Sequence, residues 1–183
     1  LGIRHDAVVR RLRPDPPAIV AFPSAWGSLD DDHELLGMLR AALPDAKLVI
    51  FGPNVTAEPL PTLRDSAADF VILGEPEEAL LLMAEGKAPA DIPNLAWLDE
   101  GELQQSERRF PPNWESYTLP ARDLLPLDRY TVPFARRHPA TTMVTVRGCP
   151  GACTFCPSHI WHQRTVRARP IALVMEEVDE LVY

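Results

Sequence analysis

Ala18-Ile-Val-Ala-Phe22, Lys47-Leu-Val-Ile-Phe51 and Asp69-Phe-Val-Ile-Leu73 are the short, mostly apolar runs that decide the fold of this chain. Continuous runs of this length, each followed closely by Gly or Pro, are typical of strands buried on both faces of a sheet. Helical periodicity lies between and after them, most clearly over residues 30–43 and 77–84. Alternating strands and helices predict an α/β fold, a partial Rossmann-like, doubly wound parallel sheet.

The loops after these strands are the candidate ligand contacts. In open α/β sheets, ligands bind outside the carboxyl ends of the strands, and a glycine there lets a ligand approach the backbone closely. Ordinary tight turns explain the same glycines equally well. The residues concerned are Ser24, Trp26, Gly52, Pro53, Gly74 and Glu75.

Two weaker patterns follow the sheet. Residues 94–105 predict a small hairpin that extends the sheet at one edge. Residues 108–140 are rich in proline and predict a connector that lies over a surface. This prediction rests on the apolar groups that the connector has to bury, which are Trp114, Tyr117, Leu124, Leu125, Tyr130 and Phe134.

The last part of the chain has the pattern of a strand over residues 141–146, a loop, and a helix over 171–183. A strand, a functional loop and a helix form the opening unit of a βα barrel, with the site at the carboxyl end of the strand. We therefore expect a sheet domain over residues 1–107, a connector over 108–140 and the start of a barrel over 141–183. Because the chain has no initiator Met and closes on an apolar helix, we expect it to be a fragment.

Composition limits the possible functions. The 183 residues include 18 Lys and Arg against 26 Asp and Glu, a formal net charge of −8. This acidic balance argues against a nucleic-acid-binding surface. The sequence contains no 18-residue apolar run and no signal-peptide pattern, so no transmembrane segment is predicted and the cytoplasm is the expected location.

The three cysteines of the chain are Cys149, Cys153 and Cys156, all within one Gly- and Pro-containing loop. Three thiolates in such a loop suit an iron-sulfur cluster or zinc better than a disulfide, and an odd count cannot be fully paired. A cluster held by three protein ligands keeps one metal position open for chemistry. The alternative is a structural zinc site, with His159 or His162 as the fourth ligand.

The spacing Cys149-x3-Cys153-x2-Cys156 after a first barrel strand resembles the signature of radical S-adenosylmethionine (SAM) enzymes. Arg147-Gly-Cys-Pro150 resembles the subfamily with an N-terminal cobalamin-binding domain, as do Arg167-Ala-Arg169 and Val174-Met-Glu-Glu177. Phe51-Gly-Pro-Asn54 and Ala68-Asp-Phe-Val-Ile-Leu-Gly-Glu75 are similar to later strands of that domain, and Leu119-Pro-Ala-Arg-Asp-Leu-Leu-Pro126 is similar to its connector. The resemblance covers nearly the whole chain.

This resemblance implies that Cys149, Cys153 and Cys156 hold a 4Fe-4S cluster whose fourth iron binds SAM, and that Phe155 lies close to the adenine. It also implies that the cluster reductively cleaves SAM, and that the strand-end residues bind cobalamin. The family acts on small-molecule or natural-product substrates by methyl transfer or cyclisation, and takes electrons from a donor such as flavodoxin or ferredoxin. No catalytic residue is assigned, and the isolated fragment is expected to be inactive.

Two other functions remain open from the residues. In one, the radical chemistry is kept but the N-terminal domain binds no cobalamin. In the other, the chain is a non-catalytic, zinc-stabilised binding module. His33 nearly matches a cobalt-ligating motif, but Gly37 lies one residue too late and the acidic residues before His33 are explained by a helix start. Arg167 and Arg169 are expected to pair with carboxylates such as Glu176 or Glu177.

Overall fold

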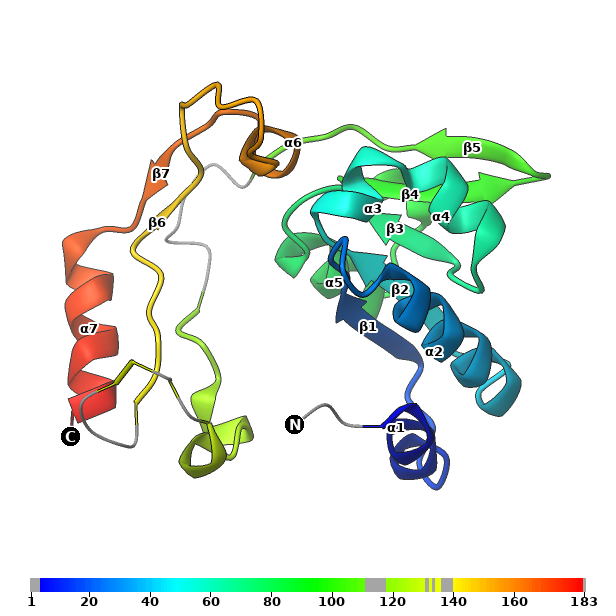
Figure 1. Cartoon of the computed structure of the whole chain (residues 1–183), viewed down its shortest axis with the longest axis horizontal. Helices are drawn as coiled ribbons and strands as arrows, with labels where there is room; N and C mark the ends of the chain where they lie inside the picture. The colour runs from blue at the N-terminus through cyan, green and yellow to red at the C-terminus, as the bar shows by residue number, and fades with distance from the viewer. Residues whose placement is uncertain (1–3, 111–117, 131, 133, 136–139, 183) are drawn as a thin grey trace.

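The computed structural model describes residues 4–110, 118–130, 132, 134–135 and 140–182. A five-stranded sheet with the order β1-β2-β3-β4-β5 forms its larger part (Figure 1). The three predicted strands pair in parallel, and the predicted hairpin pairs antiparallel with the third strand and extends the sheet as expected. The strands are β1 (Ile19–Pro23), β2 (Lys47–Phe51), β3 (Phe70–Ile72), β4 (Leu95–Asp99) and β5 (Glu102–Gln105).

Helices cover both faces of this sheet. Successive residues of a strand point to opposite faces, so the fully buried Ile50 packs with Leu36 and Leu39 on one face. The neighbouring Val49 packs with Met83 on the other face. The continuous apolar runs are explained by this two-sided burial. The helices are α1 (His5–Leu12), α2 (Leu29–Ala42), α3 (Pro53–Ala57), α4 (Pro59–Asp65), α5 (Glu77–Ala84) and the 3₁₀ turn η1 (Pro89–Asp91).

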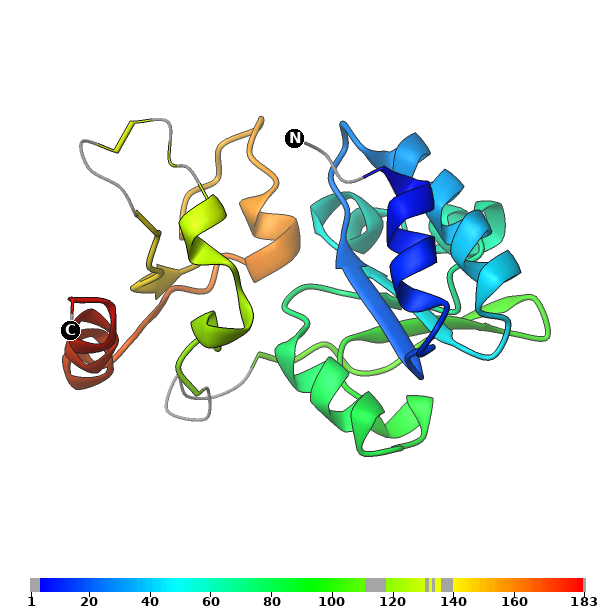
Figure 2. The same cartoon turned by 90° about the horizontal axis from the view of Figure 1, so that it is seen from below.

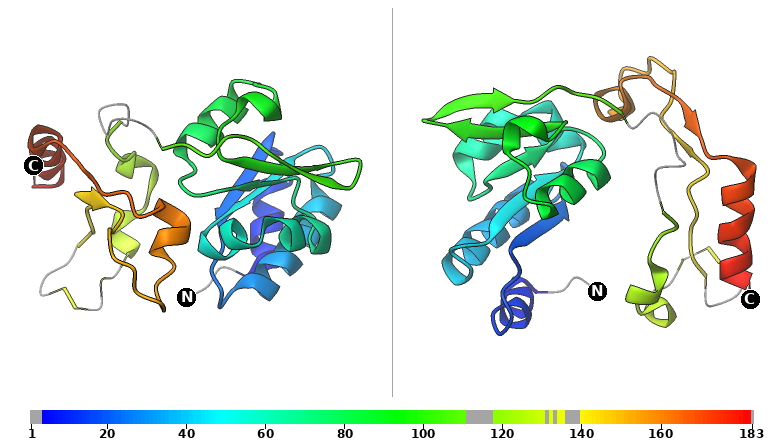
Figure 3. Two further views of the ribbon diagram at one scale, coloured as in Figure 1. Left: turned by 90° about the horizontal axis from the view of Figure 1, so that it is seen from above. Right: turned by 180° about the vertical axis from the view of Figure 1, so that it is seen from behind.

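The remaining elements form a smaller unit beside the sheet domain. It contains a two-stranded antiparallel sheet of β6 with β7. Figures 2 and 3 show that α6 is the element of this unit that lies nearest to the sheet domain, and α6 contacts α3. Its elements are the 3₁₀ turns η3 (Arg122–Leu124) and η4 (Leu127–Arg129), with β6 (Val146–Arg147), α6 (Ser158–His162), β7 (Arg167–Ala168) and α7 (Ile171–Val182).

The strand predicted over residues 141–146 is much shorter in the structure. Only Val146 and Arg147 form β6, and they pair antiparallel with β7. One further bond runs from the Arg169 N–H to the Thr145 carbonyl, at 2.9 Å. Pro170 then ends the ladder because proline has no N–H to donate, and α7 begins at the next residue. The barrel itself stays a prediction.

The predicted burial of the connector is wrong for its described apolar residues. Leu124 and Phe134 are 78% and 95% exposed, and Leu125 and Tyr130 are also exposed. The connector is held by polar contacts instead: Arg122 donates to the Thr142 carbonyl at 3.1 Å and pairs with a carboxylate of α7. Trp114 and Tyr117 lie outside the described residues, as does Tyr183 at the end of the predicted last helix. No helix among the described residues is long and apolar enough to cross a membrane.

A close backbone contact joins the loops after β1 and β2. Gly52 has a φ of 140°, and a Cβ there would lie 2.0 Å from the Ser24 carbonyl oxygen. The Ser24 N–H donates to the Phe51 carbonyl at 2.7 Å. The Asn54 side-chain amide donates to the Ser24 hydroxyl at 3.0 Å. The glycine is therefore required by the packing of the two loops against each other.

We expect Gly52→Ala to destabilise the chain by about 2–3 kcal/mol, because the new methyl group collides with backbone and the left-handed φ is unfavourable for alanine. Gly37→Ala is the matched control, since Gly37 lies in α2 with open space around it, and it should stabilise by about 0.5–1 kcal/mol. Chemical denaturation of both variants measures the difference. Equal stabilities for the two variants would contradict the packing role of Gly52.

Candidate functional site

The predicted ligand edge of the sheet is formed by the carboxyl ends of β1, β2 and β3. Ser24 is buried there, whereas Trp26 is 58% exposed. Pro53 begins α3 directly after Gly52. Gly74 lies at the end of β3, and its N–H donates to the Thr56 hydroxyl of α3 at 3.1 Å. The structure therefore brings the predicted strand-end residues to one edge, although most of them are engaged by the chain itself.

Part of this edge is covered by α6. A Cβ on Gly74, whose φ is 107°, would lie 3.2 Å from the Trp161 carbonyl oxygen. Arg108 donates to the Ile160 carbonyl at 3.0 Å and so ties α6 to the segment after β5. The segment that follows the cysteines thus lies against the end of β3. In this structure the space beside Gly74 is therefore occupied by the backbone of α6, and not by a ligand.

Glu75 is the centre of a buried charge cluster at the same edge. Its side chain is 4% exposed and forms ion pairs with Arg147, at 2.9 Å, and with Arg167. His162 Nδ1 lies 3.0 Å from Glu75 Oε1. Because a carboxylate oxygen only accepts, the imidazole donates from Nδ1. Arg147 also binds Glu77 at 2.6 Å, so it joins β6 to two carboxylates near the start of α5.

The charges in this cluster shift two pKa values in ways that agree with each other. Burial opposes ionisation of Glu75, but the hydrogen bonds and charges of Arg167 and Arg147 outweigh it, so the pKa of Glu75 lies below its ordinary value. Burial lowers the pKa of His162, and the two arginines lower it further, against the opposing effect of Glu75. An ionised Glu75 and a neutral His162 are therefore the expected state near neutral pH.

The cysteine loop begins after β6 and ends before β7. At its start, Gly148 has a φ of 88°, and a Cβ there would lie 1.7 Å from the Thr165 carbonyl oxygen. The two ends of the loop are therefore in direct backbone contact. Only glycine fits at Gly148, because this contact leaves no space for a side chain.

The three cysteines are free thiols in the structure. Cys149 and Cys153 are exposed and Cys156 is partly buried. The Gly151 N–H points at the Cys149 sulfur, at 3.4 Å, and the sulfurs of Cys149 and Cys153 both face Gly151. Among the described residues, no three His, Cys, Asp or Glu side chains are gathered as a ready-made metal site. The donor set fits a thiolate-held cluster, since the thiols share one loop and a backbone N–H points at a sulfur.

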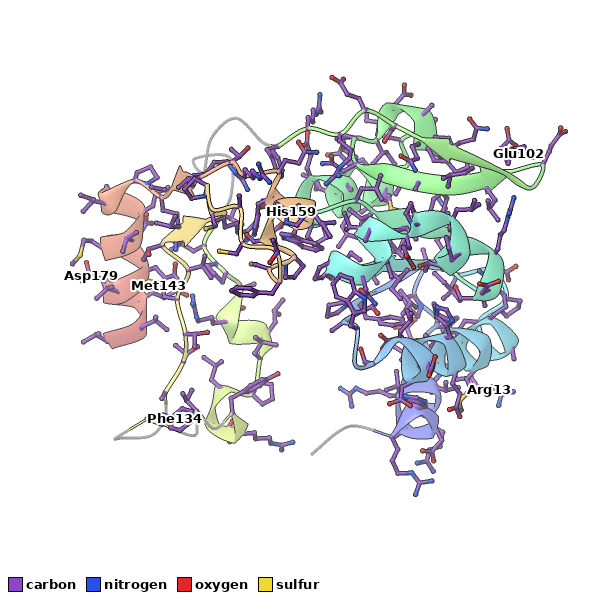
Figure 4. The ribbon with its side chains drawn as sticks, turned by 45° about the horizontal axis from the view of Figure 1, so that its top comes forward. Arg13, Glu102, Phe134, Met143, His159 and Asp179 are labelled. Carbon is purple, nitrogen blue, oxygen red and sulfur yellow. The ribbon has the colours of Figure 1, made fainter. Side chains whose placement is uncertain are left out.

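The two histidines after the cysteines have different partners. His159 Nδ1 lies 2.9 Å from the Cys156 carbonyl oxygen, and Figure 4 shows His159 on α6, on the side of the smaller unit that faces the sheet domain. His162 is bound to Glu75, as described above. Phe155, the predicted neighbour of the adenine, is 88% exposed on the same loop.

A second buried carboxylate organises the far side of the smaller unit. Glu177 of α7 has a side chain that is 1% exposed and pairs with Arg122 and Arg169. The predicted pairing of Arg169 with Glu177 is confirmed, whereas Arg167 pairs with Glu75. The Glu75 cluster was missed by sequence reasoning because its members lie 72 to 92 positions apart and follow no periodic pattern. Their common signal is charge: acidic residues follow β3, and arginines flank the cysteines.

His162 makes a testable contribution to pH dependence. Its pKa is lowered on folding, so the unfolded chain binds more protons as the pH falls through about 6.5, the ordinary histidine value. The stability that depends on a neutral His162 is therefore present above that pH and lost below it. We expect His162→Gln to flatten the fall in stability between about pH 7.5 and 5.5, measured by denaturant unfolding at each pH. Parallel profiles for His162→Gln and wild type would refute this.

Sequence relatives agree with the predicted resemblance. No protein-family model matches the chain. It is 28% identical to an uncharacterised methyltransferase of Pyrococcus horikoshii, over 96% of this chain and 38% of that protein. It is 26% identical to the cytidylyl-2-hydroxyethylphosphonate methyltransferase of Streptomyces wedmorensis, over 98% of this chain and 40% of that protein. The anaerobic magnesium-protoporphyrin IX monomethyl ester cyclase of Cereibacter sphaeroides is 24% identical, over 98% of this chain and 30% of that protein.

Solved structures show the same fold. The cobalamin-dependent SAM radical enzyme OxsB, with aqua-cobalamin and SAM bound, matches 99% of this chain with a TM-score of 0.80 and 17% identity. The radical SAM methyltransferase TsrM of Kitasatospora setae, with cobalamin and a 4Fe-4S cluster bound, matches 94% with a TM-score of 0.68 and 18% identity. The chain spans 25% and 37% of those two chains. Along nearly all of its length, this chain therefore has the fold of the corresponding part of cobalamin-dependent radical SAM enzymes, and methyltransferases and a cyclase are among its sequence relatives.

Proposed function

We propose that this chain is the cobalamin- and cluster-binding part of a radical SAM enzyme that carries out methyl transfer or cyclisation on a small molecule. The observation that carries the proposal is the position of the cysteine loop. Three free thiols stand on a loop whose ends are bound to the carboxyl edge of an α/β sheet. Such an edge is where open α/β sheets bind their ligands. The OxsB and TsrM structures, whose fold the chain shares, support the assignment.

In this proposal, Cys149, Cys153 and Cys156 would hold three irons of a 4Fe-4S cluster, with SAM on the fourth. When bound, that cluster supplies an electron, delivered by a donor such as flavodoxin or ferredoxin, for reductive cleavage of SAM. The chain's own residues position these groups. The Gly151 N–H donates toward the Cys149 sulfur, which stabilises negative charge on the thiolate. Phe155 offers an exposed aromatic ring for the adenine.

The sheet edge is proposed to hold cobalamin from the side of β1 and β2. Trp26 is exposed there, and it lies in the loop after β1, whose Ser24 contacts Gly52, the residue before Pro53 at the start of α3. An exposed tryptophan supplies a large, rigid apolar surface for a corrin ring. The division into a sheet domain over residues 1–107, a connector over 108–140 and a barrel start over 141–183 belongs to the same proposal, as does a cytoplasmic location.

The cluster assignment is tested in the full-length protein, reconstituted with iron and sulfide without oxygen. Wild type should bind about four irons per chain and show the visible absorbance of a cluster. Cys149→Ala, Cys153→Ala and Cys156→Ala should each lose most of the iron and the cleavage of SAM, and Thr154→Ala, on the same loop, should keep both. Iron bound equally by wild type and the cysteine variants would overturn the assignment, as would one zinc and no iron in wild type.

The cobalamin assignment is tested by spectrophotometric titration of the full-length protein with cobalamin. Trp26→Ala should weaken binding by about tenfold, because it removes an exposed contact of roughly 1.4 kcal/mol. Leu81→Ala is the matched control, since Leu81 is 60% exposed within α5 and is not one of the strand-end residues. Equal affinities for these two variants would exclude Trp26 as a contact. No binding by wild type would favour the version of the enzyme without cobalamin.

A further inference from the structure

The two strands that flank the cysteine loop bring two arginines together. Arg147 and Arg167 are direct partners in the β6–β7 pair. Like charges directly opposite each other destabilise an antiparallel pair. This pair is also short, and an isolated two-stranded ribbon has little stability of its own. The loop over residues 148–166 therefore starts and ends on a ladder that needs a counter-charge.

Glu75 supplies that counter-charge from the other unit of the chain. Its Oε2 accepts from Arg147 at 2.9 Å, and its Oε1 accepts from Arg167 and, at 3.0 Å, from His162. The Arg167 and Glu75 side chains are 12% and 4% exposed. Low exposure makes the charge interaction strong and makes loss of one partner costly. The carboxylate thus bridges both strands at the base of the loop.

The backbone that carries Glu75 is fixed by the sheet. Just before it, the Leu73 N–H donates to the Asn94 carbonyl at 2.7 Å, and the Gly74 N–H donates to the Thr56 hydroxyl at 3.1 Å. Leu73 is buried at 3% exposure. The position of the carboxylate is therefore set by β3 and α3, and not by the loop that it binds.

We propose that Glu75 is the positioning residue of the cysteine loop: one buried carboxylate holds both ends of residues 148–166 at the carboxyl end of β3. In this role the Glu75 side chain is directed at the chain's own arginines, which replaces its assignment as a cobalamin contact. The inference rests on the proposed function in one respect, namely that the loop would hold an iron-sulfur cluster. Its structural content concerns the loop itself and is measurable without metal.

Glu177 provides a matched control in the same chain. It is also a buried glutamate bound by two arginines, Arg122 and Arg169. Burial raises the pKa of Glu177, but hydrogen bonds from both arginines outweigh that effect and lower it, as they do for Glu75. Its partners are Arg122 of the connector and Arg169, which follows β7. Arg169 contacts the β6–β7 ribbon at the end away from the cysteine loop, through Val144 and Thr145, and neither partner bridges the two ends of the loop. A loss of general stability is thus expected at both glutamates, and a loss of loop order at Glu75 alone.

The test measures hydrogen exchange of the metal-free full-length protein in Glu75→Gln, Glu75→Asp, Glu177→Gln and Glu177→Asp. Both Glu75 variants should speed amide exchange in residues 148–166 by about tenfold relative to the matched Glu177 variants. Glu75→Asp keeps the charge, but its side chain is too short to reach both arginines. This variant therefore provides the test if Glu75→Gln does not fold. Adding Arg167→Gln to Glu75→Gln should slow the exchange again, because the like charges no longer face each other.

Equal loop exchange in the Glu75 and Glu177 variants would overturn the proposal, and so would unchanged loop exchange in the Glu75 variants. A second readout is the rate of iron loss after reconstitution, which should be faster in Glu75→Asp than in Glu177→Asp. The two proposals fail separately. If wild type binds no cluster but the Glu75 variants loosen the loop, the proposed function falls and the positioning role stands.

Discussion

The ionised carboxylate of Glu75 is the interaction on which the arrangement of the two units depends. It is buried, and it is bound by Arg147 and Arg167 from the two strands of the smaller unit and by His162 from α6. Each of these groups would be costly to bury alone. Together they allow a charged contact to hold the loop against a sheet whose two apolar clusters include no described residue of that loop. The exposed apolar residues of the connector add nothing to this contact, whereas its Arg108 adds one hydrogen bond to the Ile160 carbonyl of α6.

The sheet domain was predictable because its signals are local. The apolar runs at β1, β2 and β3 are continuous because these strands pack on both faces: β2 and β3 are largely buried, and the edge strand β1 is half-buried between the same two apolar clusters. The hairpin of β4 and β5 was marked by Gly101 between two short strand patterns. The prediction of a strand over residues 141–146 was wrong for most of its length, because β-branched composition alone does not form a strand. A strand needs a partner, and β7 offers only a short one before Pro170.

The metal-binding chemistry of the candidate site was predictable from the sequence. The residues that hold the cysteine loop in place were not. Three cysteines at close spacing indicate a set of soft metal ligands, whatever the fold around them. The residues that hold the loop come from β3, β6, α6 and β7, and only the folded chain brings them together. For the glycines at the strand ends, too, the sequence indicated the position but not the partner. Gly52 and Gly74 were expected to admit a ligand, whereas the structure places the Ser24 and Trp161 carbonyl oxygens beside them.

The backbone contact between Gly148 and Thr165 has a consequence for which residues of the loop can be changed. The contact closes the base of the cysteine loop, so the chain between these residues forms a compact excursion with its ends together. Residues such as Phe155 stand at its exposed tip and contribute nothing to the closure. Substitutions at the tip therefore leave the sheet and the base of the loop undisturbed. The folding of this part of the chain is thus separable from the cofactor chemistry proposed for the tip, so the proposed cofactor-binding residues can be changed without unfolding the loop base.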